Sequence, residues 1–156
     1  MALNSNQTEY DVFGHSAGGQ ILHRFVLFQP HSNANRILAS NSGFYTLPDF
    51  NSELPFGIKN TPLSEEDLKS SFKKQLVLFN GELDNENEKG GTLLRSPSAD
   101  KQGLHRLERG RFFYNAAKAR EMEVTFNWEL VIIPSAGHNH RKMGDATAEF
   151  LYGKNE

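Results

Sequence analysis

The segment that most constrains the fold is a short apolar strand, 10–13, which runs into a G-x-S-x-G sequence at 14–18 and then into a helix-like segment, 20–29. A serine on such a strand-to-helix turn is strained, exposes its Oγ above the sheet, and is followed by an N–H directed at a developing oxyanion. Gly14 and Gly18 tolerate the close approach and the unusual dihedral angles of this turn. The sequence therefore predicts a nucleophile elbow at Ser16, with the N–H of Ala17 as an oxyanion donor.

The residues around this turn exclude two other glycine motifs. A phosphate-binding loop would need Lys and then Ser or Thr after Gly19, where the sequence has Gln20 and Ile21, and a dinucleotide fingerprint would need glycine at position 16. Cysteine is absent, which removes thiolate metal sites and disulfides. We therefore expect no cofactor and no metal. The remaining alternative to an elbow is an ordinary Gly/Ser-rich turn between a strand and a helix.

Length and charge limit the class of protein. The 156 residues are one domain's length and can bury a sizeable core. The net charge of −2 provides no basic face for nucleic acid, and the basic run 101–111 is interpreted as a solvated helix surface. Residues 1–9 lack the apolar region of a secretory signal, and no apolar run is long enough to span a membrane. We expect neither nucleic acid nor membrane as a partner, and a cytoplasmic location by default.

Apolar patterning predicts strands and helices in alternation. Strands are expected at 10–13, 36–40, 75–79 and 126–134, and helices at 20–29, 62–74, 104–122 and 142–152. A loop with aromatic residues covers 41–56, and the longest irregular region is 80–102. Four alternations favour an α/β fold, a mostly parallel sheet with helices on both faces.

The carboxyl ends of parallel strands meet at one edge of a sheet, where an elbow serine needs a histidine and an acid. His138 follows the last strand and is the expected base, and Asp84 follows the strand 75–79 and is the expected acid, with Gly81 permitting the turn. Three alternatives remain: His140 for the base, and Asp49 and Glu82 for the acid.

Candidate substrate-binding residues lie beside the elbow and in the aromatic loop. They are His15, Phe44 and Tyr45, with Phe56 nearby. The aromatic residues of this loop are equally suited to cover the sheet, in which case they would not contact a substrate.

The motifs at 14–18, 81–84 and 137–138, each after a strand and in this order, resemble the α/β-hydrolase superfamily. The resemblance covers nearly the whole chain. It implies Ser16 as nucleophile, Asp84 as acid and His138 as base, in a serine hydrolase that cleaves an ester or similar small acyl substrate through an acyl-enzyme.

In that family the elbow strand is usually the fifth of eight, whereas nine residues precede it here. We therefore expect 1–156 to form a single domain that corresponds to the C-terminal half of a hydrolase, without the usual N-terminal strands. The alternative function is a catalytically silent or truncated module, which self-associates or binds a complementing N-terminal half.

Overall fold

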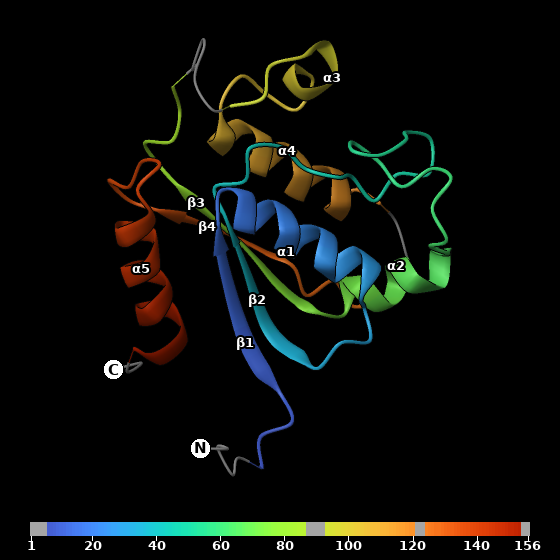
Figure 1. Ribbon diagram of the computed structural model, residues 1–156, viewed down its shortest axis with the longest axis horizontal. Coiled ribbons are helices and arrows are strands. Elements are labelled where there is room, and N and C mark those ends of the chain that lie inside the picture. Colours follow the sequence, from blue (N-terminus) through green and yellow to red (C-terminus); the bar gives the residue numbers. More distant parts are fainter. Residues whose placement is uncertain (1–5, 87–92, 121–123, 154–156) are drawn as a thin grey trace.

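The computed structural model describes residues 6–86, 93–120 and 124–153. Its centre is one parallel sheet with strand order β1-β2-β3-β4. Figure 1 shows this sheet between helices on its two faces. The strands are β1 (Tyr10–His15), β2 (Ala34–Ser40), β3 (Gln75–Gly81) and β4 (Glu129–Ile133). The helices are α1 (Ala17–Phe28), α2 (Glu65–Phe72), α3 (Pro97–Asp100), α4 (Arg106–Lys118) and α5 (His140–Tyr152).

The arrangement of the helices follows from the strand order. Because the strands are added in chain order and crossovers between parallel strands are right-handed, the connecting helices fall on one face. Helices α1, α2 and α4 lie on that face, and α5 lies on the other (Figure 1). Alternate residues of β2 serve the two layers, since Ile37 and Ala39 pack into the larger cluster and Leu38 packs into the cluster under α5.

The predicted alternation is confirmed, with differences at the ends of the elements. Strands β1 and β3 continue two residues further than predicted, so that regular strand reaches the residue before Ser16. Strand β4 starts only at Glu129, because the side chains of Phe126 and Trp128 pack edge-on against the ring of Phe72. Helix α4 ends at Lys118, and residues 121–122 of the predicted helix lie outside the described residues.

Helix α3 was not predicted from the sequence. It lies in the region 80–102, which was expected to be irregular, and is a single turn. Ser96 caps it by accepting the Ala99 N–H at 3.1 Å, and Pro97 occupies its first turn.

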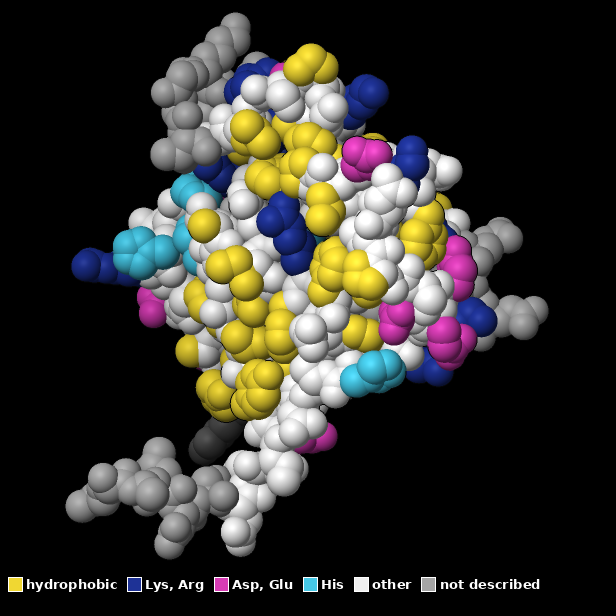
Figure 2. All heavy atoms as spheres, turned by 45° about the vertical axis from the view of Figure 1, so that its right-hand side comes forward, with side chains coloured by type: hydrophobic (Ala, Val, Ile, Leu, Met, Phe, Trp, Pro, Cys, Tyr) yellow, Lys and Arg dark blue, Asp and Glu magenta, His cyan; other side chains and the backbone are white. Residues whose placement is uncertain are grey.

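Strand β1 forms one edge of the sheet. Within the described residues its backbone pairs only with β2. Tyr10 and Ile21 beside this edge are 50% and 66% exposed, and Val12, Phe25 and Phe28 are only partly covered. Figure 2 shows hydrophobic side chains gathered on the face that carries α1.

None of the helices described here combines the length and the apolar character needed to cross a membrane.

Candidate active site

Ser16 lies on a strained turn between β1 and α1. Its φ of 57° and ψ of −112° are outside the ordinary regions for a residue with a side chain, as predicted for an elbow. The Ser16 N–H donates to the Ser40 carbonyl at 2.9 Å, which fastens the turn to β2. Ala17 begins α1, so its N–H is among those without an intrahelical acceptor.

The glycines of the elbow differ in what they permit. A Cβ on Gly14 would lie 2.6 Å from the carbonyl carbon of Gly18, so Gly14 is required for the close packing of the turn. A Cβ on Gly18 would meet no atom within 4 Å, which contradicts the prediction that this glycine is needed for close approach. The crowded position is Gly19, whose Cβ would lie 2.5 Å from the Ser40 carbonyl oxygen.

The loop after β3 carries the expected acid. The Asp84 N–H donates to the Gly81 carbonyl at 3.2 Å, and the Asp84 carbonyl accepts the Leu107 N–H at 3.0 Å. The Asp84 side chain is 5% exposed. The two rival acids have other partners: Asp49 accepts hydrogen bonds within its own loop, and a Glu82 carboxylate oxygen accepts the Ser135 N–H at 2.8 Å.

The loop after β4 brings His138 between the acid and the serine. His138 Nδ1 lies 2.8 Å from Asp84 Oδ2, and His138 Nε2 lies 3.2 Å from Ser16 Oγ. The imidazole side chain is 28% exposed, so one side of the site is open to solvent. The rival base His140 is exposed at the start of α5. The carboxyl ends of β1, β3 and β4 thus place these three side chains in hydrogen-bonding contact.

His15 contacts the same imidazole. The His15 and His138 rings lie 4.7 Å apart with 36° between their planes, and His15 Nδ1 lies 3.2 Å from Ser40 Oγ. Burial, the larger cause, and the nearby His138 together lower the pKa of His15 to about 4. His15 is therefore neutral at neutral pH. This candidate substrate-binding residue thus packs its ring against the ring of His138.

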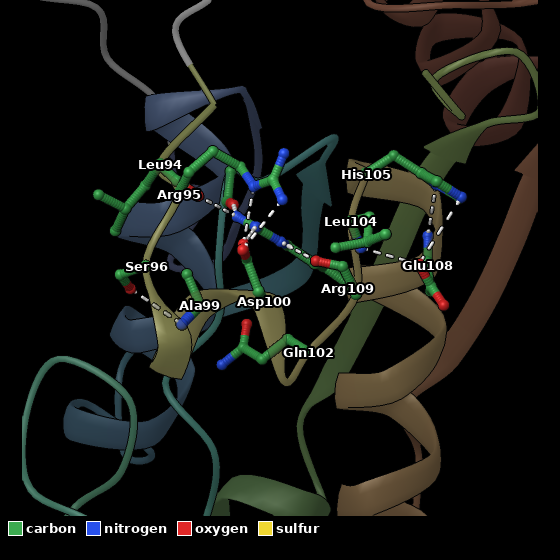
Figure 3. A network of polar contacts seen from close by, with 12 residues as sticks. Leu94, Arg95, Ser96, Ala99, Asp100, Gln102, Leu104, His105, Glu108 and Arg109 are labelled. Carbon is green, nitrogen blue, oxygen red and sulfur yellow. Dashed lines mark hydrogen bonds and ion pairs between the residues drawn. The ribbon is translucent and has the colours of Figure 1, made fainter. Parts of the chain in front are cut away.

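Two arginines of the basic run 101–111 are buried, which corrects its interpretation as a solvated surface. Arg106 is 2% exposed, and its guanidinium lies 3.5 Å from Asp84 Oδ1. Arg109 is fully buried and donates to the carbonyls of Gly43, Leu94 and Gly103. Figure 3 shows Arg109 reaching Asp100, which also binds Arg95. These arginines fasten the aromatic loop and the segment before α4 to the acid side of the site.

The aromatic loop divides between core and surface. Tyr45 is fully buried, stacked on Phe113 at 4.7 Å, so the candidate role of Tyr45 in substrate binding is corrected to packing of the core. Phe44 is half-buried, packs on Phe56 at 5.5 Å, and lies under the Arg24 guanidinium. Phe56 also lines a pocket of about 260 Å³ between this loop and α4.

Sequence reasoning did not identify Ser40, Asn41 or Arg106 as parts of this site. Ser40 and Asn41 end β2, a strand with no motif, and the signal for Arg106 was its helical spacing from the buried Phe113. Within residues 6–86, 93–120 and 124–153, no group of three or more His, Cys, Asp or Glu side chains is arranged to hold a metal ion.

We compared the chain with known protein families, curated proteins and solved structures. No family model and no curated protein matches the chain. Poly(aspartic acid) hydrolase-1 from Sphingomonas sp. KT-1 is 36% identical with a TM-score of 0.90, over 95% of this chain and 56% of that one. The poly(3-hydroxybutyrate) depolymerase LpqC from Bordetella parapertussis is 33% identical with a TM-score of 0.87, over 93% and 49%. The chain therefore has an α/β-hydrolase-like fold and is homologous to hydrolases, of whose length it spans about half.

Proposed function

We propose that this chain is a serine hydrolase that cleaves an ester or a similar acyl compound by way of an acyl-enzyme. The observation that supports this most directly is the chain of contacts from Ser16 Oγ through His138 to Asp84, at 3.2 and 2.8 Å, on a strained elbow. A serine hydroxyl is a weak nucleophile until a base takes its proton, and this arrangement supplies the base and the group that orients it.

In the proposed reaction, His138 Nε2 takes the proton of Ser16 while Oγ attacks the substrate carbonyl carbon. The Ala17 N–H, at the positive end of α1, stabilises the negative charge that develops on the carbonyl oxygen. His138 then gives its proton to the leaving oxygen or nitrogen, and the acyl-enzyme forms. Water, deprotonated by His138, attacks the acyl group, and the proton returns to Ser16 as the acid product leaves. Asp84 holds the imidazole and stabilises its charged form throughout.

The site and the relatives together support a proposal for the substrate class. The two solved relatives are named for poly(aspartic acid) and poly(3-hydroxybutyrate), polymers whose units are joined through acyl groups. The open side of His138 and the half-buried ring of Phe44 suit a substrate that lies across the surface. We therefore propose an acyl-linked substrate with Phe44 in contact with its chain.

A fluorophosphonate probe tests this proposal, because covalent labelling requires an activated serine. We expect the purified chain to be labelled and Ser16→Ala to be unlabelled. Ser98→Ala, which removes an exposed hydroxyl on α3, is the matched control and should label like the unmodified chain. Absence of labelling in the unmodified chain, or labelling that persists in Ser16→Ala, would contradict the proposal.

A second candidate function is a hydrolase-like module that acts only with further strands from a partner polypeptide. It is favoured by the edge of β1, which among the described residues pairs on one side only, and by the exposed Tyr10 and Ile21 beside it. Edge strands of stable monomers are usually protected by charge, proline or a bulge; β1 carries Asp11 and a register shift between Tyr10 and Val12, yet these apolar side chains stay exposed. Labelling that appears only after addition of the remaining half of a related hydrolase would favour this candidate over an independently active chain.

A further inference from the structure

We propose that Asn41 is a positioning residue for the reaction, which locks the loop that carries Asp84 to the loop that carries His138. We call these the acid loop (81–84) and the base loop (134–138). The inference rests on the proposed function, since it assigns Asn41 a role in keeping the imidazole in place. Among the described residues, Asn41 hydrogen-bonds to Gly81, Gly137 and Phe79 and to neither Ser16 nor His138.

Asn41 follows the last residue of β2 and is fully buried. Its Oδ1 accepts the N–H of Gly81 at 2.8 Å, and its Nδ2 donates to the carbonyl of Gly137 at 3.3 Å. Its own N–H donates to the Phe79 carbonyl at 3.2 Å. One amide therefore bonds the first residue of the acid loop and the residue directly before His138.

Apart from the contact between Asp84 and His138 itself, the other hydrogen bonds between the two loops lie further from the imidazole. The Glu82 N–H donates to Ile133, and the Leu83 N–H donates to Ala136, at 3.0 and 2.8 Å. A Cβ on Gly81 would lie 2.4 Å from the Ala136 carbonyl oxygen, so the two backbones pack directly against each other. The backbone hydrogen bonds between the two loops end at Ala136, before Gly137, where the chain turns toward His138.

The peptide between Gly137 and His138 determines where the imidazole points. Glycine leaves this peptide with unusual freedom, so an external contact is needed to fix it. The Gly137 carbonyl accepts the Asn41 amide on one side and the Asn139 N–H, at 2.8 Å, on the other. Small displacements at this point change the distances from His138 to Ser16 and Asp84, and misplacement of about 1 Å can lower a rate by about 100-fold.

The backbone at position 41 explains why an amide is found there. Asn41 has a φ of 46°, in the left-handed region that Asn, Asp and Gly adopt most readily. Among these three, asparagine alone offers an acceptor and a donor that stays uncharged. Asp and Gly at this position retain the backbone conformation and remove different parts of the link, which makes them suitable probes.

The test compares Asn41→Gly, which removes both side-chain hydrogen bonds, with Asn41→Asp, which keeps the acceptor for Gly81 and loses the donor to Gly137. Asn127→Ala is the control, because it removes a hydrogen bond from the Asn127 side-chain amide to the Lys73 carbonyl. Lys73 precedes β3 and so lies at the amino-terminal ends of the strands, opposite the site. We would measure kcat and KM on a short ester and divide kcat by the fraction of Ser16 that fluorophosphonate labels at completion. Urea unfolding of each variant would be measured in parallel.

We expect both Asn41 variants to lower kcat per titrated site by about 10- to 100-fold, with KM nearly unchanged. The Asn127 control should retain the kcat of the unmodified chain. A merely structural role would lower the titratable fraction and the stability but leave kcat per titrated site unchanged, and that result would overturn the inference.

A second readout separates this inference from the proposed function. If the unmodified chain does not react with the probe, the proposed function fails. The role of Asn41 is then tested by NMR, through the low-field signal of the proton on His138 Nδ1, which is assigned by its loss in His138→Gln. We expect this signal in the unmodified chain and a shifted or missing signal in Asn41→Gly. An unchanged signal in Asn41→Gly would overturn the positioning role.

Discussion

Two adjacent glycines at the start of α1 should respond in opposite directions to the same substitution. A Cβ on Gly18 would have no atom within 4 Å, whereas a Cβ on Gly19 would lie 2.5 Å from the Ser40 carbonyl oxygen and 2.7 Å from Ser42 Oγ. The Ser40 carbonyl also accepts the Ser16 N–H, so it cannot retreat without moving the elbow. We therefore predict that Gly18→Ala stabilises the fold and Gly19→Ala destabilises it.

The magnitudes follow from these contacts. Alanine in a helix is favoured over glycine by about 0.5–1 kcal/mol, which is the expected gain in the free energy of unfolding for Gly18→Ala. At Gly19 the same gain is outweighed by overpacking, which costs about 1–3 kcal/mol in well-packed sites. Because both variants share the helix gain, we expect them to differ by the overpacking cost of about 1–3 kcal/mol, equivalent to roughly 2–12 °C in Tm for a chain of this size.

Urea unfolding measures this difference, followed by the fluorescence of Trp128, the single tryptophan, which is 2% exposed. Gly144→Ala in α5 is the matched control, since a Cβ there also meets nothing within 4 Å, and it should resemble Gly18→Ala. Equal stability of Gly18→Ala and Gly19→Ala would refute the reasoning, as would a loss in Gly18→Ala that Gly144→Ala does not show.

Three further predictions concern the acid, the buried His23 and the edge of the sheet. Asp84→Asn should lower kcat on short esters less than His138→Ala does, because the acid orients the base and stabilises its charge; an equal loss would contradict this order. Burial lowers the pKa of His23 to about 3, so between pH 6.5 and 3 the unfolded chain binds a proton that the native state excludes. The free energy of unfolding should therefore fall over this range, by on the order of 2 kcal/mol at pH 5. Urea midpoints across this range should fall less steeply in His23→Gln, and parallel curves would exclude His23 as the cause. Light scattering with chromatography over a concentration series should show self-association through the free edge of β1, and a stable monomer at high concentration would contradict it.

The elbow and the positions of Asp84 and His138 were predictable because each depends on local information. A G-x-S-x-G sequence after a strand needs only its own neighbours to be recognised, and parallel strands place their carboxyl ends together whatever packs around them. The periodicity of apolar residues was sufficient to predict the alternation of strands and helices. The boundaries were less accurate, since the late start of β4 depends on the packing of Phe126 and Trp128 on α2.

The errors have a common physical origin, which is contact between segments far apart in the sequence. Tyr45 was a candidate for substrate binding, but its ring is stacked on Phe113 of α4. Gly18 and Gly19 look equivalent in the sequence, and only the approach of β2 distinguishes them. For the buried arginines a signal existed: Arg106, Arg109 and Phe113 are spaced by three and four residues and so lie on one face of a helix.

The same reasoning explains why the sequence did not predict a role for the end of β2, although its residues bond the loops of the site. The ends of β1, β3 and β4 each carry a reactive side chain, so motifs point to them. The end of β2 carries no member of the triad. Yet the Ser40 carbonyl accepts the Ser16 N–H, and the Ser40 hydroxyl contacts His15. Asn41 forms hydrogen bonds with both the acid loop and the base loop. Motifs identify which groups can react, whereas the distances between those groups are set by residues that need only the right backbone and one polar atom. Substitutions at Ser40 and Asn41 should therefore disturb the geometry of this site more than their lack of reactive chemistry suggests.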